Sequence, residues 1–180
     1  MWPASQPRLV GTACALRPLT DRDVSNLVAA CRDPEIARFT RVPVPYTEAD
    51  ARSFVSLAGH AWQSREGSWF AIADAADELI GACSVMDVNQ SGSAAEIGYW
   101  VAPAARGRGA ARTALGLITT WAHRELGLDR LHLQIEDANR ASAVVAEAAG
   151  YRPLDEVSEW ELKGAPRRLR HYQHLLVGGV

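Results

Sequence analysis

Apolar residues recur three or four positions apart along several stretches of the chain, which is the pattern of one face of a helix. The clearest stretches are 24–31, 51–62, 111–122 and 144–149. Three of them follow a residue type that caps helix N-termini, namely Thr20, Thr47 or Asn139, and a glycine follows the third and fourth stretches. Pro34 opens a further short piece through Phe39. The pattern therefore predicts about four helices.

Shorter runs rich in apolar residues predict strands, some of them with clean alternation. These runs cover residues 14–17, 69–74, 79–87, 95–101, 131–135, 152–162 and 169–177. The polar turn 74–78 joins the second and third runs into a hairpin, and the turn 164–166 separates the last two. A strand–helix–strand crossover spans about 95–135. The order of elements is mixed α/β, and we expect one domain over 1–180 with loose ends at 1–12 and 178–180.

Composition narrows the class of protein. A hydrophobic content of 48% over 180 residues is enough for one core. The formal charge of −2 gives no basic field for nucleic acid or an anionic membrane, and no run of 18 apolar residues or signal-peptide pattern occurs. Three scattered cysteines and five histidines lack disulfide or metal spacing. We expect a cytoplasmic protein with no metal site, no membrane span and no nucleic-acid partner.

The segment RGRGAAR at 106–112 lies between a predicted strand and a predicted helix. Unpaired N–H groups and the helix dipole favour an anion at such a helix start. Arg108 and Arg112 are unfavourable there by roughly 0.3 to 1 kcal/mol each, and a bound pyrophosphate would reverse that sign. The alternative is a tight turn whose arginines point into water. Arg112 replaces the third glycine of a dinucleotide fingerprint, and the single lysine, Lys163, excludes a nucleotide-triphosphate loop.

Two segments resemble the GNAT acetyltransferase superfamily. Residues 95–101, Pro103 and RGRGAA look like its acetyl-CoA signature, R/Q-x-x-G-x-G/A, which Arg106, Gly109 and Ala111 match. Residues 139–142, NRAS, followed by EAAGY at 147–151, resemble its second conserved segment. The stretches 16–23 and 33–36 resemble the RimJ/RimL branch, the N-terminal acetyltransferases of ribosomal proteins and their relatives. The likeness covers about residues 14–176.

The resemblance implies a GNAT fold, with a central, mostly antiparallel, splayed sheet of about six to seven strands flanked by about four helices. It implies acetyl-CoA as acyl donor, in a cleft between the strands at 99–101 and 131–135, with a main-chain N–H near Val101 polarising the thioester carbonyl. The implied cofactor-binding residues are Tyr99, Trp100, Val101, Arg106, Gly107, Arg108, Gly109, Ala110, Ala111, Arg112, Asn139 and Ser142.

Two residues are candidates for catalysis. Glu96 lies in an apolar strand beside the expected cleft and could take a proton from the attacking amine through water; the alternative is a strand-end carboxylate facing solvent. Ser142 could contact the cofactor or assist thiolate departure, or could serve the first turn of a helix. Asn139 is a helix cap, a cofactor contact or both. Ala146 occupies the position where many superfamily members place a tyrosine acid.

The acceptor is expected near the loop 39–46, where Arg41 and Tyr46, together with Trp69, are candidate substrate-binding residues; aromatic residues at such spacing also serve as core. The expected activity is acetyl transfer to a primary amine, either a protein N-terminus or a small-molecule amine, by direct attack. A longer acyl donor and a non-catalytic acyl-CoA-binding or regulatory module remain alternatives. Similar proteins are commonly homodimers, and composition does not decide the oligomeric state.

Overall fold

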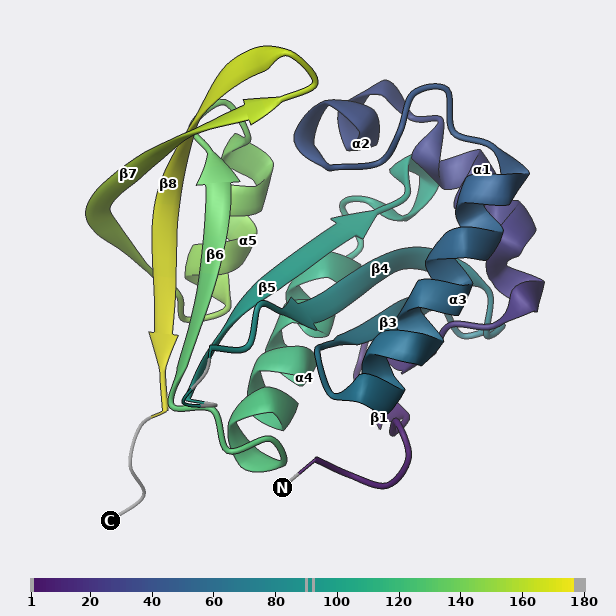
Figure 1. Cartoon of the computed structure of the whole chain (residues 1–180), viewed down its shortest axis with the longest axis horizontal. Coiled ribbons are helices and arrows are strands. Elements are labelled where there is room, and N and C mark those ends of the chain that lie inside the picture. The colour runs from purple at the N-terminus through teal and green to yellow at the C-terminus, as the bar shows by residue number, and fades with distance from the viewer. Residues whose placement is uncertain (1, 90, 92, 177–180) are drawn as a thin grey trace.

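The computed structural model describes residues 2–89, 91 and 93–176 (Figure 1). Within these residues the strands form one eight-stranded sheet in the order β1-β2-β3-β4-β5-β6-β8-β7. Neighbouring strands are antiparallel except β5 and β6, which are parallel. The strands are β1 Leu9–Val10, β2 Ala15–Pro18, β3 Ser68–Ala73, β4 Leu79–Met86, β5 Ala94–Val101, β6 Arg130–Glu136, β7 Arg152–Leu162 and β8 Ala165–Leu175. The mostly antiparallel mixed α/β prediction is confirmed, with slightly more strands than expected.

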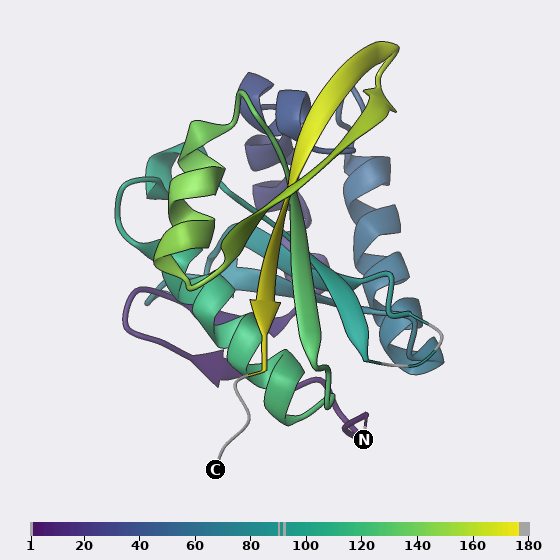
Figure 2. The same ribbon diagram turned by 90° about the vertical axis from the view of Figure 1, so that its left-hand side faces the viewer.

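The described part of the chain has five helices, four of which cover the two faces of this sheet. They are α1 Val24–Cys31, α2 Pro34–Phe39, α3 Glu48–Ser64, α4 Ala110–Arg124 and α5 Arg140–Ala148, with 3-10 turns at Asp21–Asp23 and Pro103–Ala105. Helices α4 and α5 cover one face, and α1 and α3 cover the other (Figures 1 and 2). No described helix is long and apolar enough to cross a membrane.

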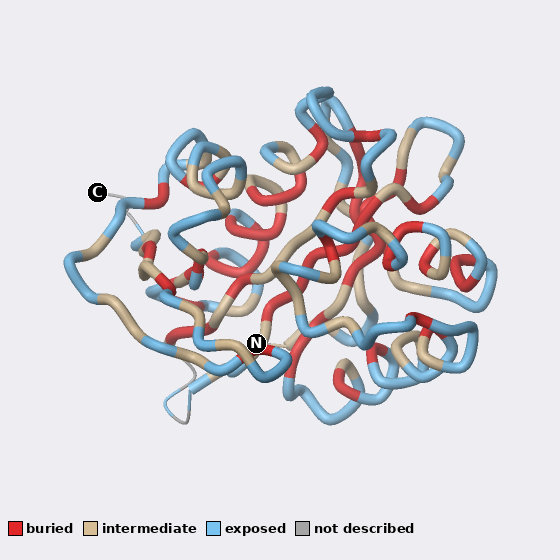
Figure 3. The backbone as a smooth tube through the Cα atoms, turned by 90° about the horizontal axis from the view of Figure 1, so that it is seen from above, coloured by how far each residue is buried: buried red, intermediate tan, exposed pale blue. Residues whose placement is uncertain are grey.

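Each helical layer has its own core. The larger cluster joins Leu115, Ile118 and Trp121 of α4 to alternate residues of the strands, including Ile97 and Leu133. The smaller cluster joins α1 and α3 to the opposite face of the sheet. Buried backbone accordingly runs through the centre of the molecule, while exposed backbone follows the loops and outer helix faces (Figure 3). The alternation of Leu131, Leu133 and Ile135 with polar residues is confirmed, since these three residues of β6 belong to the cluster that contains α4.

Two boundaries predicted from the sequence are wrong. Leu9 and Val10, expected to be loose, pair with β2, and the Gln6 side chain bonds to Ser68 and to the carbonyl of Trp69. A two-residue strand is too short to show a period. The last hairpin turns at residues 163–164, both with positive φ, so β8 begins at Ala165 instead of 169. The expectations for residues 177–180 fall outside the described residues.

Candidate active site

A cleft opens where β5 and β6 separate. The two strands pair only at Ala94–Arg130, Ala95–Leu131 and Glu96–His132. Beyond that point β5 stays paired with β4 as far as Val101, while β6 stays paired with β8 as far as Glu136, and the two ribbons diverge (Figure 1). Residues 97–100 and 133–136 line a cavity of about 600 Å³ between them. One edge of β5 therefore has main-chain groups available to a ligand.

The turn after β5 leaves the start of α4 open. Gly107 and Gly109 have φ values of 73° and 80°, which side chains rarely adopt, and Gly109 is the N-cap with no side chain to bond the helix. The first main-chain bond of the helix runs from the N–H of Thr113 to the carbonyl of Gly109. The N–H groups of the first three residues, 110–112, consequently have no helical acceptor. This is the geometry of an anion site.

The arginines of the turn divide into two kinds. Arg108 and Arg112 are exposed and take part in none of the ion pairs found among the described residues. Arg106 instead donates to the carbonyl of Val101 at 3.2 Å and pairs with Asp33 at 2.7 Å and Glu35 at 3.4 Å. Its own N–H is bonded to the carbonyl of Pro103. The Arg106 side chain therefore links this turn to α2 and its N-cap, and its role in cofactor binding stays a prediction.

The ion pair with Arg106 also affects the pKa of Asp33. Partial burial by itself would raise the pKa of this carboxyl, but hydrogen bonds from the Arg106 guanidinium and the N–H of Ile36 hold it below its ordinary value. Asp33 is thus the N-cap of α2 and the anchor of Arg106 at once.

Ser142, Tyr99 and Asn139 meet at the start of α5 and line the cleft. The Asn139 side chain accepts from the N–H of Ser142 at 3.2 Å, so capping is confirmed. The Tyr99 hydroxyl lies 2.8 Å from the Ser142 Oγ and donates to the Ser142 carbonyl at 3.1 Å. Burial raises the pKa of Tyr99 to about 12, so its phenol is neutral at ordinary pH. Two hydroxyls are therefore held together at this wall of the cleft.

Glu96 faces the cleft from the other side of β5. Its side chain is 15% exposed, which places it within the cleft instead of at an open strand end. Its Oε2 accepts from the Gln134 amide at 2.9 Å and lies 3.7 Å from the His132 Nε2. His132 and Gln134 were not singled out from the sequence, although the alternation of β6 puts both on the face opposite Leu131 and Leu133. Glu96 therefore lines the cavity with the Gln134 amide and the His132 ring as its polar neighbours.

The three candidate acceptor residues all line the cavity, in different ways. Tyr46 is 5% exposed and belongs to the α1–α3 core, where burial raises the pKa of its phenol. Trp69 is half-buried, and Trp100 packs against the same core. The Arg41 guanidinium stacks 4.3 Å above the ring of Trp160, a residue that the sequence did not bring to attention.

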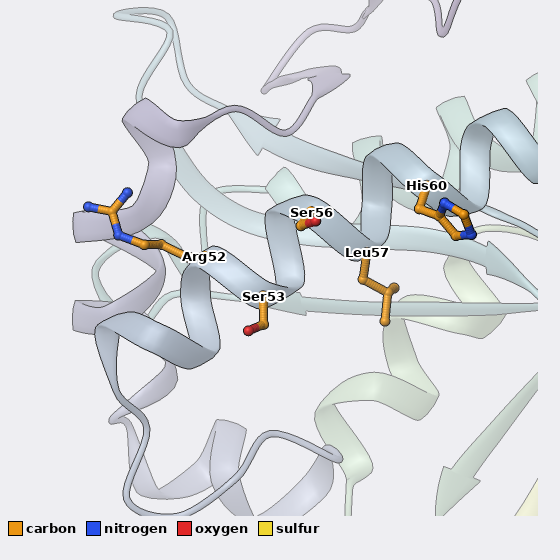
Figure 4. A pocket seen from close by; sticks show the side chains of 5 residues that line it. All are labelled: Arg52, Ser53, Ser56, Leu57 and His60. Atoms are coloured by element: carbon orange, nitrogen blue, oxygen red, sulfur yellow. The ribbon is translucent and has the colours of Figure 1, made fainter.

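A second hollow, on the outer side of α3, has no such convergence. Arg52, Ser53, Ser56, Leu57 and His60 project from one helix (Figure 4). Arg52 is occupied by Glu48 one turn earlier, at 2.7 Å. Among the described residues no group of three or more His, Cys, Asp or Glu side chains is arranged to hold a metal ion.

Comparison with known proteins gives one consistent result. The family model described as acetyltransferase (GNAT) domain matches residues 14–152. The uncharacterized N-acetyltransferase p20 of Bacillus licheniformis is 24% identical over 148 residues, covering 81% of this chain and 83% of that protein.

Two solved structures resemble the whole fold. One is RimL, the ribosomal L7/L12 alpha-N-protein acetyltransferase, in complex with coenzyme A (21% identity, 94% and 98% coverage of this chain and that one, TM-score 0.82). The other is Mycobacterium smegmatis RimJ in complex with a CoA disulfide (21% identity, 91% and 82% coverage, TM-score 0.83).

Proposed function

Because the chain belongs to the GNAT acetyltransferase family and its fold is similar to those of RimL and RimJ, we propose that it transfers the acetyl group of acetyl-CoA to a primary amine by direct attack. The observation that carries this proposal is the open start of α4, which directly follows the β5 strand that borders the cleft. The two similar structures with bound CoA species support the choice of donor.

The donor would bind mainly through main-chain groups, at its pyrophosphate and along its pantetheine arm. Its pyrophosphate would accept from the free N–H groups at 110–112, with Arg108 and Arg112 adding charge. Its pantetheine arm would pair with the unpartnered edge of β5, as an added strand does. This binding mode uses Arg106 only indirectly, because its guanidinium fixes the turn against Asp33.

The chemistry would follow from the two walls of the cleft. The neutral amine attacks the thioester carbon, a main-chain N–H near Val101 stabilises the developing oxyanion, and Glu96 removes the amine proton directly or through one water. The carbon–sulfur bond then breaks, and the Ser142 hydroxyl donates a hydrogen bond to the departing thiolate. Tyr99, with a pKa of about 12, is a poor acid toward a thiol of ordinary pKa near 8.5. Its role would be to position Ser142, and the thiolate would take its proton from solvent.

The test combines ligand binding with turnover. Acetyl-CoA at 100 times its dissociation constant should raise the free energy of unfolding by about 2.7 kcal/mol, and NAD should not. Glu96→Gln should keep this stabilisation and lose roughly 100-fold or more in kcat. Glu159→Gln, on the exposed β7, is the matched control and should behave as wild type.

Each outcome of this test is informative. Absence of any stabilisation by CoA would overturn the donor site. Binding without turnover of any amine would favour the non-catalytic acyl-CoA-binding module. Full activity in Glu96→Gln would remove this carboxylate from the mechanism, and tight binding of longer acyl-CoA species would widen the donor class.

A further inference from the structure

The part of the cleft on the α3 side of the sheet has an apolar floor beside Glu96. Met86 is the direct cross-strand neighbour of Glu96, so both side chains project from the same face. The next row on that face is Trp69, Ser84 and Gly98, in register across β3, β4 and β5. Because Gly98 has no side chain, the end of the Met86 side chain lies over it, 2.9 Å from where a Cβ would stand, and Met86 and Glu96 line the cavity side by side.

The outer side of the same space is closed by the β7–β8 hairpin. Trp160 of β7 lies under the Arg41 guanidinium, with 4.3 Å between the carbon of that group and the ring centre. At the hairpin turn the Lys163 ammonium donates to the carbonyl of Ala37 in α2. Figure 1 shows the hairpin tip reaching toward α2. These contacts join two walls that are more than 110 residues apart in sequence, and place a second aromatic ring over the cavity.

Glu96 is the carboxylate of the cavity with the least direct compensation. Glu136 is paired with Arg167 at 3.2 Å, and the Asp50 carboxylate, although ionised, accepts from the N–H and the hydroxyl of Thr47 in the capping box of α3. Glu96 has a neutral amide and the His132 imidazole as neighbours, with no arginine or lysine paired to it in the described residues. A cation is therefore attracted to Glu96, while Met86, Trp69 and Trp160 offer apolar contact in the same cavity.

We propose, on the basis of the function proposed above, that the acceptor is a monoamine whose amino group is attached to an apolar body, aromatic or branched aliphatic. The amine lies at Glu96, and the body packs between Met86, Trp69 and Trp160. A small arylalkylamine and a peptide with an apolar first residue share this chemistry.

The experiment compares acceptors at saturating acetyl-CoA. Expected is a kcat/KM for 2-phenylethylamine roughly tenfold or more above that for ethylamine, because the pocket gains contact with the added ring. Spermidine, which carries several ammonium groups and no apolar body, should have a lower kcat/KM than 2-phenylethylamine. Two tetrapeptides that begin with Phe or with Ser separate the sources, since a peptide acceptor predicts that the Phe peptide exceeds 2-phenylethylamine. Faster acetylation of spermidine, or equal values for ethylamine and 2-phenylethylamine, would overturn the inference.

Variants locate the effect. Trp160→Ala should raise KM for 2-phenylethylamine roughly tenfold, leave KM for acetyl-CoA within about twofold and shrink the preference over ethylamine; Trp160→Phe should restore most of it. Glu159→Ala, on the opposite face of the same strand, is the control. Calorimetric binding of the same amines to the CoA-saturated wild-type protein tests acceptor class without turnover. Selective binding of 2-phenylethylamine would support the inference even if no amine were acetylated, and binding of spermidine alone would contradict it.

Discussion

The N-termini of α4 and α5 differ in whether a side chain caps them. Both helices begin with N–H groups that the helix itself cannot satisfy. In α5 the Asn139 side chain accepts from the N–H of Ser142. In α4 the N-cap is Gly109, which has no side chain, holds a φ of 80° and is followed by an arginine in the first turn. The cap satisfies one N–H group of the α5 start, whereas no side chain of the turn does so for α4, whose start therefore favours a ligand that carries negative charge.

A capping side chain at position 109 should make the start of α4 resemble that of α5 and weaken CoA binding. In Gly109→Asp the new Cβ meets only the Ala13 Cβ at 3.8 Å, and Asp tolerates the left-handed conformation better than most residues. Its carboxylate would occupy the N–H groups and repel the pyrophosphate, so CoA affinity should fall roughly 100-fold, about 2.7 kcal/mol. Isothermal titration measures this loss. Gly109→Asn has a side chain of similar shape without the charge, and its CoA affinity should fall less than about tenfold. Equal losses of affinity in the Asp and Asn variants would assign the effect to backbone strain.

Removing the cations should separate stability from binding. In the free protein Arg108 and Arg112 oppose the dipole of α4, so the Arg108→Ala, Arg112→Ala double variant should gain roughly 0.6 to 2 kcal/mol of stability. Its CoA affinity should instead fall roughly tenfold, because charged hydrogen bonds to phosphate are lost. Thermal unfolding with and without CoA measures both signs. Losses of the same sign in both measurements would mean that the arginines serve the fold and not the ligand.

The closed start should respond in the reverse way. Asn139→Ala removes a cap and should lower the free energy of unfolding by about 1 kcal/mol, with CoA affinity changed less than about threefold. Thr47→Ala at the capping box of α3 is the matched control, with a similar expected loss and no effect on activity. Denaturant unfolding and CoA titration of both variants provide the comparison. A much larger loss of CoA affinity in Asn139→Ala would make this residue a cofactor contact as well as a cap.

The open start could be predicted from sequence because it is local. Gly107, Gly109 and the arginines are contiguous, and a strand-to-helix turn with that composition has few alternatives. The helix starts at Thr47 and Asn139 were predicted for the same reason, since a cap acts over three residues. The two-residue β1 was missed because so short a segment carries no period.

The remainder of the site depends on partners far apart in the chain. Arg106 matches the family consensus, but its side chain is held by Asp33, which lies 73 residues away in sequence, and no local pattern shows this contact. Trp160 contacts Arg41 only because the hairpin reaches α2, and His132 approaches Glu96 only through the β5–β6 register. Alternation predicts which face a residue takes but not which strands become neighbours, so the acceptor side of the cleft could not be assembled from the pattern.

The C-terminal end of α4 offers the smallest and most separable perturbation. There the His123 ring bonds the carbonyl of Leu128 and lies 3.0 Å from the Nδ1 of His174 in β8. Burial, and then the charge of His123, lower the pKa of His174 below its ordinary value of 6.5. Below pH 6.5, His174 is therefore protonated in the unfolded chain, while in the folded chain it becomes protonated only at a lower pH. Stability from this group is present above pH 6.5 and is lost as pH falls through that window.

Replacing His174 should remove that dependence without touching the donor site. The free energy of unfolding should decline in wild type as pH falls from 7.5 to 5, and the decline should be shallower in His174→Gln. The contribution of His174 to this slope should stay below that of one full proton, which is about 1.4 kcal/mol per pH unit. His60→Gln, on the exposed side of α3, should retain the wild-type slope. CoA affinity at pH 7.5 should be the same in all three proteins, because His174 lies at the opposite end of α4 from the proposed pyrophosphate site. A parallel loss of CoA affinity in His174→Gln would show that packing at this end of the helix sets the geometry of the open start, and the contrast between the helix ends would no longer be local.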